Sequence, residues 1–327
     1  MPGERLAALP IDAEVHVLGA SLSAYDVINL LFSESTGCRF PDDGPNRFRF
    51  EPGHNQRSVV LCSRSGRLKK CQSLFPAAQR REHFTAAAIA AMQERSVSLE
   101  QVFDLMLADA RLNGADIDTG ALFSPYADVN DATALNTRAA GILATDIDAA
   151  SAQDPLSNYV VDFLDQAQFD TWDLFATHKL TEAAEQRYRN EVESALLSCA
   201  APCPALTAKR ILALMQAGRL RIVHGVGGIE SDGDRFHIEH AFGTETAKFL
   251  VNATSVVDRD IQSARQPTLF RNLAKRGYLR PYSLQGKPAP GIDVDMRTFR
   301  CRGARNIYAA NMFLWGPGFF TSSAILM

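Results

Sequence analysis

Nothing in this sequence resembles a membrane span or an export signal. None of its apolar runs approaches the ~18 residues needed to cross a bilayer, because polar residues interrupt each one. The first residues, Met-Pro-Gly-Glu-Arg, are not the start of an apolar signal core. With 46% hydrophobic and 22% charged residues, the composition is that of a globular protein, and we expect a cytoplasmic location.

The sequence also lacks a strong charge of either sign and a cysteine framework. Its formal net charge of -3 gives no reason to expect a nucleic acid or an anionic membrane as partner. The six cysteines have irregular spacings, and Cys199-x3-Cys203 has no second pair to complete a zinc site. We therefore expect reduced thiols and no metal site.

The chain begins with an α/β pattern. VHVLGASLSAYDVINLL, residues 15–31, predicts a strand, a tight turn and an amphipathic helix, and a second strand is expected at 58–62. A strand, a helix and a strand in so few residues form a βαβ unit. The handedness rule makes its two strands parallel neighbours.

The turn of this unit is similar to the Gly-x-Gly-x-x-Ala turn that holds a dinucleotide. Gly19 permits the tight turn, Ser21 is small enough for a pyrophosphate to approach, and Ala24 permits close packing of helix on strand. At the helix N-terminus, around Leu22 and Ser23, unpaired N–H groups and the positive dipole end favour an anion. Because Ser21 replaces the middle glycine, an ordinary βα turn is the alternative.

Gly19-Ala20-Ser21-Leu22-Ser23 is also one residue short of the Gly-x-Ser-x-Gly elbow of a serine hydrolase. That elbow follows a central strand, with further strands and an oxyanion loop before it. Ser21 instead follows the first strand, and Ser23 takes the place of the last glycine. A hydrolase with Ser21 as nucleophile is therefore the weaker interpretation.

The end of the second strand indicates which dinucleotide is bound. Ser63-Arg64-Ser65-Gly66-Arg67 contains no acid to bind a ribose 2′-hydroxyl, as an NAD site would. Arg64 can form a forked contact with a 2′-phosphate, assisted by Ser63 and Arg67. The pattern favours NADPH, and a solvated basic loop is the alternative.

Several segments together resemble the FAD/NAD(P)-binding flavoproteins with two dinucleotide-binding domains, near the flavin-containing and N-hydroxylating monooxygenases. They are VHVLGASLSAYDVI, SRSG, KFLVNATS and GIDVDMRTFRCRGARNIYAANMFLWGPGFFTSSA. The resemblance covers most of residues 11–327. It implies NADPH and FAD as cofactors, a small-molecule substrate, and hydride transfer from NADPH to the flavin. It also implies cofactor contacts at Thr254, Gly316, Gly318, Phe319 and Thr321.

The sequence departs from this family at three places. Ser255 stands where the family has a glycine, and Asn311 stands near a position that is often acidic. A second glycine-rich turn, which would bind the FAD pyrophosphate, is missing. We therefore expect a fragment or one subunit of an NADPH/FAD-dependent oxidoreductase, with the FAD-opening domain on a partner polypeptide or with self-association. The alternative is a non-catalytic nucleotide-binding or regulatory module.

The predicted fold is α/β: a Rossmann-like, three-layer NADPH-binding domain with a helical insertion and a C-terminal FAD-side β segment. The expected boundaries are 1–76 for the first part of that domain, 77–204 for the insertion, 205–265 for the remainder and 266–327 for the C-terminal segment. Local signals support the elements. Ser98-Leu-Glu-Gln101 predicts a helix start, and Asp232-Gly233 predicts a hairpin turn.

Overall fold

The computed structural model describes residues 2–76, 78–154, 156–254, 260–284, 286–309 and 314. The chain is a mixed α/β protein that divides into two compact units. The first unit comprises Met1–Ala78, Asp118–Asp165 and Ser194–Thr254. The second comprises Gln79–Ile117, Gln166–Glu193 and Ser255–Met327. The stretch 77–204, predicted as one helical insertion, thus contributes residues to both units.

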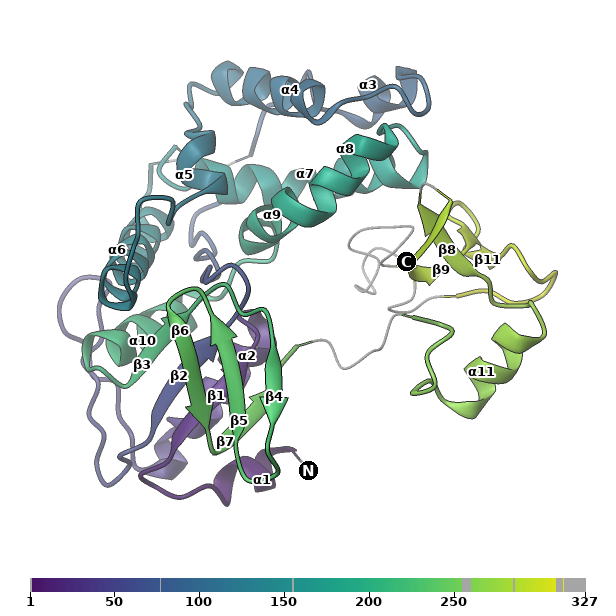
Figure 1. Ribbon diagram of the computed structural model, residues 1–327. Coiled ribbons are helices and arrows are strands. Elements are labelled where there is room, and N and C mark those ends of the chain that lie inside the picture. The colour runs from purple at the N-terminus through teal and green to yellow at the C-terminus, as the bar shows by residue number, and fades with distance from the viewer. Residues whose placement is uncertain are drawn as a thin grey trace. The chain divides into compact units, whose positions relative to one another are not determined.

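A parallel sheet of four strands forms the centre of the first unit (Figure 1). Its strands are β1 (Glu14–Leu18), β2 (Ser58–Cys62), β3 (Leu220–Val223) and β7 (Phe249–Asn252), in the order β3-β2-β1-β7. Glu14 pairs with Ser58 and Leu18 with Cys62, which confirms the predicted parallel pairing of the first two strands. Both faces of the sheet are covered, and Val15, Val17, Val60 and Ile222 of β1, β2 and β3 are almost fully buried, whereas Phe249 to Val251 of β7 are half-buried.

Helices cover one face of this sheet. They are α1 (Pro2–Ala7), α2 (Leu22–Leu31), α6 (Ala132–Ser151) and α10 (Ala205–Gln216). Tyr25 and Ile28 of α2, Leu143 of α6 and Ile211 of α10 share one core with Val15 of β1. Each of these side chains is at most 1% exposed, so this layer contains the main core of the unit. The short helices η1 (Glu34–Thr36) and α5 (Thr119–Phe123) also belong to the first unit.

An antiparallel three-stranded meander covers the other face. It consists of β4 (Ile229–Ser231), β5 (Phe236–His240) and β6 (Gly243–Ala247). Ile238 and Ala247 pack on Val60 of the parallel sheet and are fully buried. Ser231 pairs with Phe236, which confirms the predicted hairpin around Asp232-Gly233. The first unit therefore has three layers: helices, parallel sheet and meander.

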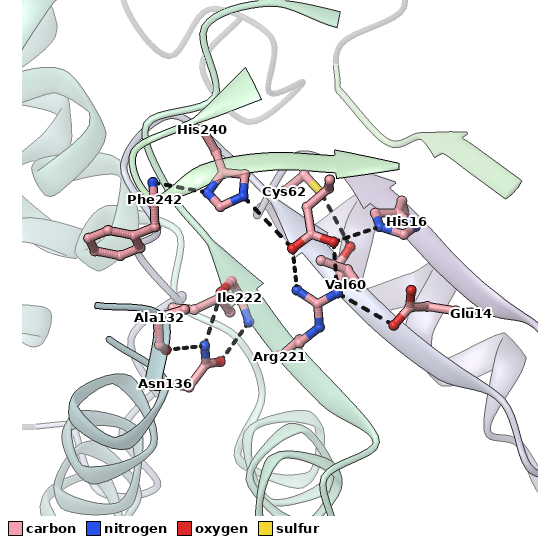
Figure 2. Close-up of polar contacts among 11 residues, drawn as sticks. Glu14, His16, Val60, Cys62, Ala132, Asn136, Arg221, Ile222, His240 and Phe242 are labelled. Atoms are coloured by element: carbon pink, nitrogen blue, oxygen red, sulfur yellow. Dashed lines mark hydrogen bonds and ion pairs between the residues drawn. The ribbon is translucent and has the colours of Figure 1, made fainter. Parts of the chain in front are cut away.

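Polar contacts also join the meander to the sheet (Figure 2). Arg221 of β3 donates from Nη1 and Nη2 to the two carboxylate oxygens of Glu245 on β6, at 2.6 and 2.8 Å. His16 of β1 lies 3.5 Å from the same carboxylate and is 1% exposed. The contact with Arg221 lowers the pKa of Glu245 to about 2, and burial lowers the pKa of His16. At neutral pH this cluster thus holds an ionised Glu245 and a neutral His16.

The outer edge of β3 is closed by a side chain of α6. The amide of Asn136 accepts from Ile222 N at 2.7 Å and donates to Ile222 O at 3.1 Å (Figure 2). It thereby takes the place that a further strand would occupy. The helix that carries Asn136 was not predicted, because small residues interrupt its apolar stripe of Leu135, Leu143 and Ile147.

The second unit is largely helical. Its elements are α3 (Ala86–Ala91), α4 (Leu99–Leu112), α8 (Glu182–Arg187), the π-helical turn Tyr188–Val192, α11 (Thr268–Lys275), β8 (Pro281–Leu284), β9 (Lys287–Ile292), β10 (Val294–Asp295) and β11 (Arg300–Cys301). Helices α7 (Tyr159–Ala176) and α9 (Glu193–Ala200) contribute residues to both units. Ser98 and Gln101 form both hydrogen bonds of a capping box at the start of α4, as predicted. No helix in the described ranges is long and apolar enough to cross a membrane.

Candidate functional site

The carboxyl ends of the four parallel strands meet at one edge of the sheet. Gly19 follows β1, Ser63 follows β2, His224 follows β3 and Ala253 follows β7. The chain passes from β1 outward to β2 and β3, whereas β7 lies on the other side of β1. Open parallel sheets bind ligands where the strand order reverses in this way, outside the carboxyl ends of the strands. The edge between β1 and β7 is therefore the candidate site.

Gly19 has a structural role that the sequence did not reveal. Its φ of +109° is a conformation that side chains disfavour. A Cβ at this position would lie 3.2 Å from both the carbonyl carbon and the oxygen of Ala253. The backbone is further fixed because Gly19 N donates to Cys62 O at 2.8 Å. Gly19 is thus needed for the close approach of β7 as well as for any ligand.

The N-terminus of α2 is open beside this turn. Ser21 is the N-cap residue, with an extended backbone and no capping hydrogen bond from its side chain. Ser21, Leu22 and Ser23 are exposed, whereas Ala24 is fully buried in the core. The first N–H groups of a helix have no partner inside it and carry partial positive charge. This end of α2 can therefore receive an anion.

The loop after β2 contains two arginines, of which Arg64 is exposed and Arg67 is hydrogen-bonded within the protein. Arg64 is exposed and makes no side-chain hydrogen bond or ion pair with any described residue. The guanidinium of Arg67 instead donates from Nη1 to Leu122 O at 2.7 Å and from Nη2 to Phe123 O. Burial lowers the pKa of Arg67. Arg64 is thus the arginine of this loop that is available to a phosphate, while Arg67 is bound within the protein.

The end of β7 supplies the other side of the edge. Thr254 is exposed, and both its hydroxyl and its N–H donate to Asn252 Oδ1, at 2.6 and 3.0 Å. These bonds fix the backbone around Ala253. The remaining predicted contacts, Gly316, Gly318, Phe319 and Thr321, lie outside the described residues. Ser255 and Asn311, where the sequence departs from the family, also lie outside them.

His224 also lies at this edge, although no residue pattern marked it as a site residue. It follows β3, and its ring packs edge-on against Phe242 with centroids 5.0 Å apart. Its Nε2 is buried and has no hydrogen-bond partner among the residues that the structure describes. Burial lowers the pKa of His224, so the ring is neutral at neutral pH. A signal was present in the sequence, where His224 directly follows the β-branched pair Ile222-Val223.

Other polar clusters are less suited to a site. A shallow groove of about 890 Å³ along α6 is lined by the Lys70–Asp146 ion pair, whose atoms lie 2.8 Å apart. Arg138 of that groove is likewise paired, with Asp128, and Asp131 caps α6 by accepting from Ala134 N. Cys71 and Cys203 face each other in a parallel bridge and are fully buried. Within the described ranges, no three His, Cys, Asp or Glu side chains are grouped to hold a metal ion.

Comparison with known proteins assigns this chain to no group: no protein-family model matches it, and no curated protein matches its sequence. The candidate site is therefore defined by its own residues, which are the Gly19 turn, the N-terminus of α2, the Arg64 loop, His224 and the end of β7.

Proposed function

We propose that the first unit binds NADPH at the carboxyl edge of its parallel sheet, as a Rossmann-like domain does. The observation that carries this proposal is Arg64, which is exposed and unpaired among the described residues at the end of β2. The glycine turn and the open N-terminus of α2 lie at the end of the neighbouring strand β1. One ligand with a pyrophosphate and a ribose 2′-phosphate would match both features.

The two anionic groups would be held by different means. The pyrophosphate would lie at the first N–H groups of α2, beside the Gly19 turn. The 2′-phosphate would lie at Arg64, whose guanidinium can donate two parallel hydrogen bonds to it. The hydroxyl of Ser63 accepts a hydrogen bond from Gly66 N at 2.9 Å and retains its own proton for a phosphate oxygen.

We propose further that this chain is the NADPH-binding part of a flavin-dependent oxidoreductase or monooxygenase. NADPH supplies a hydride when bound, and the acceptor implied by the family resemblance is FAD. The chain's own residues would bind and orient the nucleotide. The residues expected beside the flavin lie outside the described ranges, so they receive no role here.

Calorimetric titration with NADPH and NADH tests the nucleotide assignment. Wild type should bind NADPH at least tenfold more tightly than NADH, since a hydrogen bond to a charged group is worth about 1.5–3 kcal/mol. Arg64→Ala should remove this preference and leave NADH binding nearly unchanged. Arg49→Ala, at an exposed arginine paired with Glu51, is the control and should keep the preference. Equal affinities in wild type would refute the proposal.

Two further measurements separate the alternatives. A flavin absorption spectrum of the purified protein, alone and after addition of FAD, distinguishes an oxidoreductase from a module that only binds nucleotide. The hydrolase is disfavoured because the Ser21 hydroxyl has no hydrogen bond to a base among the described residues. Ser21→Ala should therefore weaken NADPH binding only slightly, and loss of esterase activity in this variant would reverse that choice.

A further inference from the structure

Arg67 ties the loop after β2 to a helix that is distant in the sequence. Its guanidinium donates to Leu122 O at 2.7 Å and to Phe123 O, both at the end of α5. Carbonyl groups in the last turn of a helix have no partner inside it and carry partial negative charge, so they suit a cation. The arginine thus satisfies the end of α5 and anchors the loop at the same time.

Tyr126, just after α5, makes a second contact with this loop. Its hydroxyl donates to Gly66 O at 3.3 Å, and burial raises the pKa of Tyr126 to about 12, so the proton is retained. Gly66 has a φ of +66°, and a Cβ there would lie 2.7 Å from Cβ of His224. The loop is therefore confined between Tyr126 and His224 at Gly66.

The backbone on either side of Arg64 is also held. Gly225 N donates to Arg64 O at 2.8 Å, and Val226 N donates to Ser63 O at 3.3 Å. Gly66 N donates to Ser63 Oγ, which closes the turn. The main chain of Arg64 is thus fixed by the segment after β3, while its side chain has no described partner. A fixed backbone with an exposed side chain is what a binding residue needs, because little of its structure must be ordered when the ligand binds.

We infer that Arg67 and Tyr126 are positioning residues for Arg64, through which α5 sets the selectivity of the site for a 2′-phosphorylated nucleotide. This inference rests on the proposed NADPH binding. Without the contacts to α5, the loop would have to be ordered when the nucleotide binds, and that ordering costs affinity. This ordering would weaken the binding of NADPH and hardly that of NADH, because Arg64 would contact only the 2′-phosphate.

The test compares Arg67→Lys with Arg57→Lys, and the readout is the ratio of the dissociation constants for NADH and NADPH. Arg57 is a matched control because its guanidinium also donates to two backbone carbonyls, those of Pro10 and Leu9. It precedes β2, whereas Arg67 follows it, so the two lie beyond opposite ends of the strand. Arg67→Lys should lower the ratio about threefold or more. Arg57→Lys should leave the ratio unchanged even if it lowers stability.

A double variant distinguishes positioning from direct contact. In the background of Arg64→Ala, Arg67→Lys should change the ratio no further, because its effect passes through Arg64. Additive effects would mean that Arg67 binds the phosphate itself and would overturn the inference.

Tyr126→Phe removes one hydroxyl and should lower the ratio in the same direction, which keeps the test valid if Arg67→Lys does not fold. A wild-type ratio in both Arg67→Lys and Tyr126→Phe would overturn the inference but not the proposed function. A wild type without NADPH preference would overturn the proposed function instead.

Discussion

The carboxylate of Glu245 on β6 accepts hydrogen bonds from both terminal guanidinium nitrogens of Arg221 on β3, and this pair joins the meander to the parallel sheet. Glu245→Gln should lower the free energy of unfolding by about 1–3 kcal/mol, because Arg221 loses its charged acceptor. Urea denaturation followed by circular dichroism measures this change.

The exposed pair Arg49–Glu51 provides the control for this prediction. Both of its side chains are more than 40% exposed, at 62% and 44%. Water screens such a pair, so Glu51→Gln should change stability by less than about 1 kcal/mol. Equal effects of the two Gln substitutions would contradict a special role of Glu245 in joining the layers.

The stability of the protein should depend on pH through His16. Burial lowers the pKa of His16 below its usual 6.5, so the unfolded chain binds a proton more readily than the folded one. The contribution of His16 is therefore fully present above pH 6.5 and is lost as the pH falls through the lowered pKa. The carboxyl of Glu245, with a pKa of about 2, changes stability only below its usual 4.5.

Denaturation midpoints at a series of pH values test this expectation with His16→Gln. The variant should have a flatter dependence than wild type just below pH 6.5, even if its stability is lower throughout. His178 and His224, whose pKa values burial also lowers, remain in the variant and account for the residual slope. Parallel curves for the two proteins would show that His16 is not buried in its neutral form.

Gly19→Ala should destabilise the fold even without a ligand. The new Cβ would lie 3.2 Å from the Ala253 carbonyl, and the backbone would keep a left-handed φ, at a cost of about 1–3 kcal/mol. Gly141→Ala is the control, since a Cβ there meets nothing within 4 Å and alanine favours the helix. Thermal unfolding of both variants and of wild type measures the change in melting temperature. An unchanged melting temperature in Gly19→Ala would argue against the close approach of β7.

The thiols should be unreactive in the folded protein. All six cysteines are buried, and burial raises the pKa of Cys71 to about 11 and that of Cys62 and Cys203 to about 12. Because the thiolate is the reactive form, Ellman's reagent should modify the native protein about a hundredfold or more slowly than the denatured chain. Rapid modification of one equivalent under native conditions would contradict this prediction.

The sequence by itself determined those elements whose signals are local. Alternating or continuous apolar runs marked β1 and β2, Asp232-Gly233 marked the hairpin, and Ser98 with Gln101 marked the start of α4. It did not reveal α6, because small residues such as Ala139 interrupt the apolar stripe of that helix. Nor did it mark the π-helical turn Tyr188–Val192 that separates α8 from α9.

Only the tertiary structure decided which of the residues that could bind a ligand are accessible to one. Arg64 and Arg67 are equally basic in the sequence, yet carbonyl groups more than fifty positions away hold Arg67 and leave Arg64 exposed. Gly19 likewise owes part of its role to Ala253, which follows the last strand of the sheet. Such pairings depend on how distant segments pack, and local residue patterns carry no information about which segments will meet.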